Sequence, residues 1–307
     1  MPSQRIRSIT PDPILTSIVR GYTPTERFVY SEIFPIIDVD KEKGRIRTYG
    51  KEHFRTYNSA RALHGDSNIG KGMNSSMVSY ELDEREISIP IDYREEAESE
   101  DNLRADYAEL AMRNIMLGIE EEVAGLVQNT STYAAGHTEA LTGTDKFSDP
   151  GCKPVTLIND AKLTVASKIG IQPNTLLLSD DSFKALKDNP SMIELIKYSQ
   201  KGIVTLDLMK ELFEVDNIIV ADSIITDASD NFVNLYNNVA MLSYIAPQGA
   251  RNKNNASFGY TLQLKGFPKG DEWMSDNQKV TYIRATTIMK QMILMQEAAY
   301  LFTGTVD

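Results

Sequence analysis

The chain is poor in the residues that build most metal and disulfide sites. Its 307 residues include one cysteine, Cys152, and three histidines, His53, His64 and His137. A single thiol cannot close an internal disulfide, and it excludes a cysteine-rich zinc centre. The histidines lack both an H-E-x-x-H pairing and a second histidine at ligand spacing. We therefore interpret Cys152 as a small filler residue or a surface thiol, and we expect the histidines at the surface.

Positive charge and long apolar runs are also scarce. Acidic residues outnumber Lys and Arg by 43 to 32, giving a net charge of −11, which argues against a broad nucleic-acid grip. The longest apolar runs are pieces such as "MILM", far short of the roughly 20 residues of a membrane span. The N-terminus lacks the apolar stretch of a signal peptide. We expect no membrane contact and a soluble, cytoplasmic setting.

Catalytic motifs are missing as well, apart from one partial match. Residues Gly65 to Lys71 follow the spacing of a phosphate-binding loop, but Gly72 stands where a magnesium-binding hydroxyl is required. A polar stretch precedes these residues and a strand-like one follows, whereas such a loop needs a buried strand before it and a helix after it. We predict no enzyme activity and no cofactor. A nucleotide-binding α+β protein using Gly65–Lys71 remains the alternative outside the structural class.

The residue patterns in the first third of the chain predict an N-terminal arm, two strands and a long loop. Closely spaced prolines in residues 1–27 predict an arm with one short helix near Pro13–Arg20. "RFVYSEIFPIIDVD" and "KGRIRTYG" predict two strands joined by a turn at Lys41–Gly44. Residues 54–88 begin polar and glycine-containing and end in the alternating pattern of "MVSYELDEREISIPIDY".

The strongest element is a helix over residues 102–128. Its apolar residues are four apart throughout: Leu103, Tyr107, Ala111, Ile115, Ile119, Val123 and Val127. Leu110, Leu117 and Ala124 add a second row. Because a row with a spacing of four drifts around the helix, we expect contact with more than one sheet.

The remaining sequence changes texture twice. Residues 129–153 are rich in Gly, Ser, Thr and Asp and predict an irregular linker. Residues 154–247 alternate helical and strand patterns, and residues from 248 onward favour strands, with no internal repeat. "DASDNF" predicts a hairpin turn between "SIIT" and "FVNLY".

Charges of opposite sign are segregated along the second strand region and the loop before it. Basic residues dominate up to Lys71, and acidic residues dominate from Glu81 onward. One interpretation is a solvated charged surface. The sharper hypothesis is that the two limbs meet across copies of the same protein and fix their register. The candidate contacts are Arg55, Arg61, Lys71, Glu81, Glu84 and Glu86.

Several stretches together carry a family resemblance. They are "FVYSEIFPIIDVDKEKGRIRTYGKEHFR", "YIAPQGARNKNNASFGYTLQL" and above all "PNTLLLSDDSFKALKDNPSMIELIKYSQKGIVTLDLMKELFEVDNIIVADS". The chain resembles the major capsid proteins of tailed double-stranded DNA bacteriophages, along nearly its whole length. The resemblance implies the α+β Hong Kong 97-like fold. It implies an N-terminal arm with leading strands, an extended loop, a peripheral domain with a spine helix at 102–128, and an axial domain. The arm and leading strands would span residues 1–53, and the extended loop residues 54–88. The peripheral domain would combine residues 89–153 and 248–307, and the axial domain would span residues 154–247.

The same resemblance implies a function and a set of partners. We expect a head protein that self-assembles, as hexamers and pentamers, into an icosahedral shell around a double-stranded DNA phage genome, without sequence-specific binding. The implied partners are a portal protein and possible separate scaffolding and cement proteins. The expected location is the virion, after assembly in the host cytoplasm.

Three further expectations follow from the comparison with this family. Some relatives carry a scaffolding segment that a protease removes, and we expect none within Met1–Asp307. Some relatives join a loop lysine to an asparagine of a neighbour, and Lys71 would be the donor here. An encapsulin-like nanocompartment shell is the alternative within the fold, and its enclosed cargo would be protein instead of long DNA.

Overall fold

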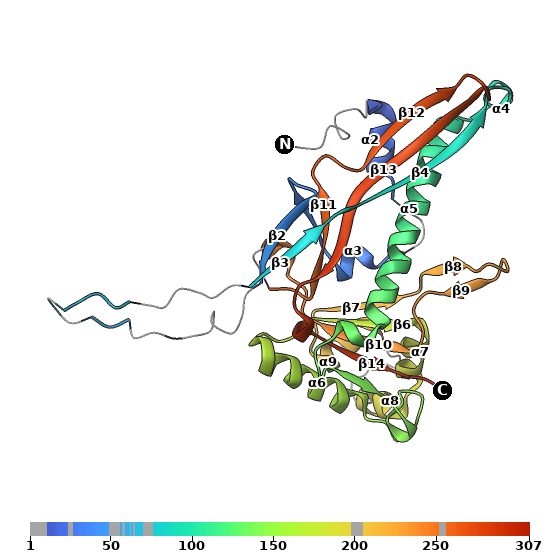
Figure 1. The fold of residues 1–307 in the computed structure, drawn as a ribbon. Helices are drawn as coiled ribbons and strands as arrows, with labels where there is room; N and C mark the ends of the chain where they lie inside the picture. The colour runs from blue at the N-terminus through green and yellow to red at the C-terminus, as the bar shows by residue number, and fades with distance from the viewer. Residues whose placement is uncertain are drawn as a thin grey trace.

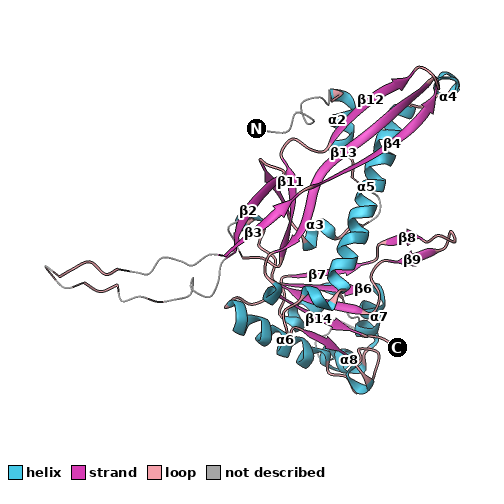
Figure 2. Ribbon diagram, viewed as in Figure 1, coloured by secondary structure: helices cyan, strands magenta, loops and turns pink. Residues whose placement is uncertain are grey.

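A computed structural model of the chain describes residues 11–23, 27–48, 56, 59–61, 63, 65–69, 76–197, 205–251 and 256–307. Two five-stranded sheets are connected by one long helix, α5 (Leu103–Gln128), which runs along the first sheet and reaches the second (Figure 1). Strands dominate the upper half of the view and helices surround the sheet of the lower half (Figure 2). The architecture is therefore α+β.

The first sheet is organised around one strand, β13, which is 14 residues long. The strand order is β1-β11-β13-β12, with β4 on the other side of β13, and all pairs except β1–β11 are antiparallel. The strands are β1 (Ile36–Val39), β4 (Asp83–Asp92), β11 (Gly259–Leu264), β12 (Lys269–Ser275) and β13 (Val280–Ile293). The strand character expected from residue 248 onward is confirmed by β11, β12 and β13.

The second sheet has the order β5-β14-β10-β6-β7. Its strands are β5 (Thr138–Ala140), β6 (Thr175–Ser179), β7 (Asn217–Ala221), β10 (Val239–Ser243) and β14 (Ala299–Thr303). Every residue of β6 and β10 is buried. Four helices complete this part: α6 (Pro154–Ile169), α7 (Asp180–Asp188), α8 (Pro190–Lys197) and α9 (Leu206–Phe213). Residues 299–303, assigned above with 248–307 to the peripheral domain, instead pair with β10 in this sheet.

Two short hairpins project from the sheets. β2 (Lys43–Thr48) pairs with β3 (Ser76–Glu81), and β8 (Ile224–Thr226) pairs with β9 (Phe232–Asn234). The turn of the second hairpin is the one predicted from "DASDNF". The Asp227 carboxylate accepts hydrogen bonds from the Ser229 and Asn231 amides at 2.7 and 2.9 Å. These backbone donors lower the pKa of Asp227.

The remaining elements are short. They are α2 (Pro13–Gly21), α3 (Tyr30–Ile33), α4 (Tyr93–Glu98), and the 3-10 turns η2 (Thr130–Thr132), η3 (Gly143–Asp145), η4 (Gln248–Ala250) and η5 (Gln296–Ala298). The Asp12 carboxylate accepts hydrogen bonds from the first amides of α2, as expected for a helix cap. The predicted short helix near Pro13–Arg20 is thereby confirmed.

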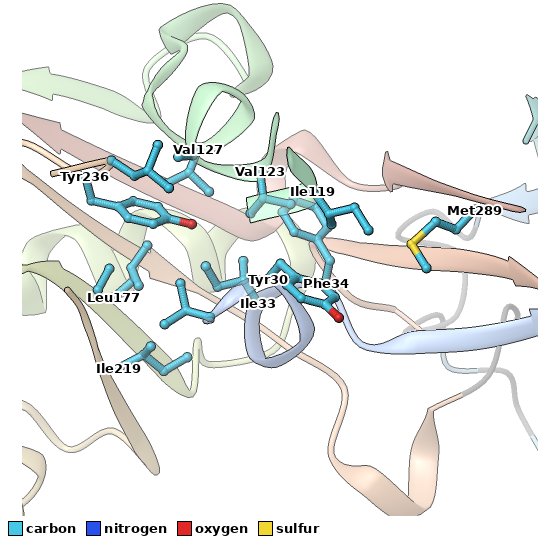
Figure 3. Close-up of a cluster of buried hydrophobic side chains, with 14 of the residues drawn as sticks. Tyr30, Ile33, Phe34, Ile119, Val123, Val127, Leu177, Ile219, Tyr236 and Met289 are labelled. Atoms are coloured by element: carbon cyan, nitrogen blue, oxygen red, sulfur yellow. The ribbon is translucent and has the colours of Figure 1, made fainter. Parts of the chain in front are cut away.

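The long helix follows its prediction closely. Its cap is Asn102, whose side chain accepts a hydrogen bond from the Ala105 amide at 3.4 Å, and it ends at Gln128. The row from Ala111 to Val127 is buried in one cluster with Ile283 of the first sheet and Leu177 of the second. Figure 3 shows side chains of α5, α3 and the second sheet meeting in this cluster. The expected contact with two sheets is confirmed.

The two strands predicted from residues 27–40 and 43–50 are present as β1 and β2, but the first is shorter than predicted and the two do not pair with each other. Tyr30–Ile33 form the helix α3, and β1 pairs with β11 while β2 pairs with β3. Both Ile33 and Phe34 are completely buried in the cluster that surrounds α5. Burial of these two apolar side chains under the long helix outweighs the local strand preference of the segment.

The histidine prediction is wrong at the one histidine that the structure describes. His137 is buried, and its Nδ1 lies 3.0 Å from the Ala299 carbonyl, because β5 packs beside β14. His53 and His64 lie outside the described residues. Cys152 is buried, and burial together with nearby Asp145 and Asp149 raises its pKa to about 11. A protonated, buried thiol fits the filler role.

Candidate assembly surface

The predicted contact residues do not form one cluster within the subunit. Arg55 and Lys71 lie outside the described residues. The Nε of Arg61 donates a hydrogen bond to the Gly65 carbonyl at 2.6 Å within its own loop. Glu81 pairs with Lys43 across the β2–β3 hairpin. The opposite-sign limbs thus already meet once inside one chain, at an exposed pair that contributes little stability.

Glu84 and Glu86 lie on β4, within the range predicted as extended loop, yet β4 is a full member of the first sheet. Alternate residues of β4 face α5, since Arg85 forms an ion pair with Glu122 of that helix. Glu84 and Glu86 therefore point to the opposite face of the sheet and are exposed. We call this the outer face; its named residues are Glu84, Glu86, Asp271, Trp273, Tyr282 and Arg284.

Arg284 organises the outer face. Its Nε lies 3.0 Å from Asp271 Oδ1, its second guanidinium contact is Asp271 Oδ2, and Glu86 lies 3.5 Å away. The guanidinium also covers the Trp273 ring at 4.8 Å, and Trp273 stacks on Tyr282 with centroids 5.0 Å apart. The hydrogen bond to Asp271 is the main cause that raises the pKa of Arg284. Glu86 is accordingly held by its own chain.

Arg284→Ala is expected to lower the free energy of unfolding by about 2 kcal/mol. The substitution removes a two-pronged charge-assisted hydrogen bond and leaves Asp271, which is 6% exposed, without its guanidinium partner. Arg284→Lys, the control, keeps the charge and should recover part of the loss. Urea unfolding followed by circular dichroism measures both variants. Equal stability of Arg284→Ala and the parent chain would contradict this account.

A second polar site lies inside the molecule, where α5 meets α3 and the second sheet. The Glu120 carboxylate is buried and accepts hydrogen bonds from the Tyr30 amide at 2.9 Å and the Val29 amide at 3.2 Å. The hydroxyls of Ser223 and Tyr236 each lie 3.0 Å from its Oε1. We call these five residues the Glu120 junction.

Burial dominates the electrostatics of this junction. Loss of solvent raises the pKa of Glu120, and the Tyr30 and Val29 amides and the Tyr236 and Ser223 hydroxyls oppose that shift without cancelling it. Burial and the neighbouring carboxylate also raise the pKa of Tyr30, to about 12. The junction was missed in the sequence. Its signal was a charged residue inside the second apolar row, three positions after Leu117 and four before Ala124.

The structure gives no support to a nucleotide loop at Gly65–Lys71. Residues 65–69 are neither helix nor strand, residues 70–75 lie outside the described ranges, and the next described element is the strand β3. Within the described ranges, no group of three His, Cys, Asp or Glu side chains is arranged to hold a metal ion. In the same part of the chain, none of the helices has the length and apolar character needed to cross a bilayer.

Comparison with known proteins adds the decisive observation. A profile described as "Phage major capsid protein E" matches residues 121–231. A protein of Burkholderia phage BcepMu named "Major capsid protein" is 40% identical over 296 residues, covering 95% of this chain and 96% of that protein.

Solved structures agree with this relationship. The crystal structure of a phage-related protein from Bordetella bronchiseptica RB50 superimposes with a TM-score of 0.80 at 27% identity, covering 96% of this chain and 97% of that one. A chain of the cyanophage P-SCSP1u capsid gives 0.57 at 10% identity, covering 92% and 90%. The SrpI encapsulin of Synechococcus elongatus gives 0.56 at 10% identity, covering 96% of each chain. The last two show a shared fold alone, which is the Hong Kong 97-like capsid fold. The 40% identity along nearly the whole length is what assigns the family, and the chain belongs to the major capsid proteins of bacteriophages.

Proposed function

We propose that copies of this chain assemble into a closed icosahedral shell that encloses a double-stranded DNA phage genome. The observation that carries the proposal is the 40% identity to a phage major capsid protein over 95% of the chain. A capsid protein is a component of the virion and acts as an assembly of many copies. We further propose hexamers and pentamers, assembly in the host cytoplasm, and association with a portal protein and with separate scaffolding and cement proteins. The family is structural, and we propose no catalytic activity.

The loop between β2 and β3 supports assembly by mutual burial. Leu63 and Ile69 are 90% and 92% exposed in the single subunit. In a single subunit, these exposed side chains gain almost no free energy from burial against their own chain. Fixing the backbone of each residue costs on the order of 1–2 kcal/mol. A neighbouring subunit would supply the apolar surface on which Leu63 and Ile69 become buried as the shell forms. Many weak contacts of this kind close a particle together.

The charged candidates fit the same arrangement. Arg61 lies in this loop, and Glu84 lies exposed on the outer face of the first sheet. We propose that Arg55, Arg61 and Lys71 of one copy meet Glu81, Glu84 and Glu86 of the next. Since Glu86 and Glu81 already have intrachain partners, Glu84 is the acidic residue most open to a neighbour.

Particles purified from producing cells test the function directly. We expect closed shells by electron microscopy, long nuclease-protected DNA inside them, and an assembly yield that falls as salt screens the charged contacts. A discrete protein cargo without long DNA would favour the encapsulin-like alternative. Recovery of the chain only as a monomer of about 34.3 kDa would contradict shell formation.

A further inference from the structure

The Glu120 junction connects three parts of the chain that are distant in sequence. Glu120 belongs to α5, Val29 and Tyr30 begin α3, and Ser223 follows β7. All four partners of the carboxylate are uncharged hydrogen-bond donors, namely two backbone amides and two hydroxyls. A buried carboxylate satisfied only by neutral donors keeps a large cost of burial. The four donors favour the ionised form, but burial is the larger effect and gives a proton at this position an energetic advantage.

A count of hydrogens leads to the same result. Ser223 Oγ lies 3.0 Å from Glu120 Oε1 and 2.9 Å from the Arg27 carbonyl oxygen. A carbonyl and an ionised carboxylate are both acceptors, whereas a serine hydroxyl has one hydrogen to donate. With Glu120 ionised, one of these two short contacts has no hydrogen. A proton on Oε1 removes the conflict, because the acid then donates to Ser223 Oγ and Ser223 donates to Arg27.

The charged groups of the surrounding elements pair with one another or are exposed to solvent. Arg27 and Glu32 pair with each other at 3.7 Å, Arg85 pairs with Glu122, and Glu121 and Asp222 are exposed. The other titratable groups at the site are tyrosines: Tyr30, Tyr236, and Tyr133, which influences Tyr236. Burial is the first cause that raises the pKa of each of these tyrosines, so they stay neutral near pH 7.

We propose that Glu120 is a proton-binding site that fixes the segment at Arg27–Tyr30 and the segment after β7 onto α5. In the protonated state a relay runs from Glu120 Oε1–H to Ser223 Oγ and from Ser223 to the Arg27 carbonyl. Loss of the proton leaves a buried charge and breaks one link of the relay. The two attached segments then hold less firmly to the long helix.

The direction of the pH effect follows from the raised pKa of Glu120. The folded junction binds the proton more tightly than an unfolded chain, in which the ordinary value is 4.5. Its stabilisation is complete below pH 4.5 and is lost as the pH rises through the higher folded-state pKa. This is the reverse of the usual behaviour of a carboxylate that is stabilised by a cation.

Infrared titration of the full chain tests the proposal whether or not it is assembled. The wild type should show the carbonyl band of a protonated, buried carboxylic acid, with a midpoint above that of exposed carboxylates, because burial raises the pKa of Glu120. Glu120→Gln should lack this band, and Glu121→Gln, a matched change at the next and exposed position of α5, should keep it. A wild-type spectrum in which every carboxylate titrates at ordinary pH would overturn the proposal even if Glu120→Gln failed to fold.

Two further readouts separate the relay from a passive buried acid. Amide exchange of peptides covering 27–34 and 222–236, corrected for its intrinsic pH dependence, should accelerate several-fold as the band disappears, and should be pH-independent in Glu120→Gln. Ser223→Ala removes the acceptor of the proton, so the midpoint should move down. An upward movement would show that Ser223 donates to the carboxylate, and the relay would be wrong.

Discussion

Replacing residues 49–75 by the dipeptide Asn-Gly is expected to leave a folded subunit that no longer forms shells. Thr48 of β2 and Ser76 of β3 are directly paired, so a two-residue turn can close the hairpin without changing its register. Among the residues that the structure describes, every buried core residue lies outside 49–75. Circular dichroism and the unfolding midpoint should therefore match those of the parent chain.

Assembly should fall by about 100-fold or more, since the contact is repeated in every subunit of the shell and its loss multiplies. The deletion removes Leu63 and Ile69, whose near-complete exposure gives them surface to bury on a neighbour. Gradient sedimentation and electron microscopy measure the yield of particles. The control is a Gly/Ser linker of the same length in place of 49–75, which keeps the span and removes the side chains. Normal shells from that control would contradict the role of the loop side chains.

Gly259→Ala is expected to lower the free energy of unfolding by about 3 kcal/mol, the upper part of the range for overpacking. A Cβ at this position of β11 would lie 2.4 Å from the Phe34 ring and 2.6 Å from the Met292 carbonyl oxygen. Phe34 is completely buried against Phe258, and the Met292 carbonyl is part of the β11–β13 pairing. Neither neighbour can move without disturbing the first sheet.

Gly125→Ala is the matched comparison for this substitution. Gly125 is an exposed residue inside α5, and nothing lies within 4 Å of a Cβ added there. The same chemical change should stabilise the protein by about 0.5–1 kcal/mol, because alanine restricts the unfolded chain and favours the helix. Denaturant unfolding of both variants gives the comparison. Equal effects of the two substitutions would show that the crowding at Gly259 is not real.

Local patterns predicted the parts of the fold that depend on local physics. The four-residue spacing placed α5 correctly at both ends, because a helix makes all its backbone hydrogen bonds with near neighbours. The turn at Asp227 followed from side-chain acceptors within the turn itself. The pairing of strands that are distant in the sequence could not be predicted from local patterns. β1 pairs with β11 more than 200 residues later, so no adjacent pattern identifies its partner.

The candidate surface shows the same limit. Segregated charges drew attention to Glu84 and Glu86, but alternation along β4 could not indicate that Arg284 holds one of them. That pair requires the register of β4 on β13, which only the folded sheet provides. The importance of Glu120 depended in the same way on distant partners, Ser223 and Tyr236. The only sign of the Glu120 junction in the sequence was a single acidic residue within an apolar row.

The position of β14 has a consequence for biosynthesis. This strand contains residues 299–303 and lies between β5 and β10, inside the second sheet. The first sheet likewise waits for β13, which spans residues 280–293. Translation proceeds at roughly 5–20 residues per second, so a nascent chain lacks the finished first sheet until residue 293 has emerged and the finished second sheet until residue 303 has emerged. A nascent chain that has not yet released β14 therefore cannot present both completed sheets to another copy.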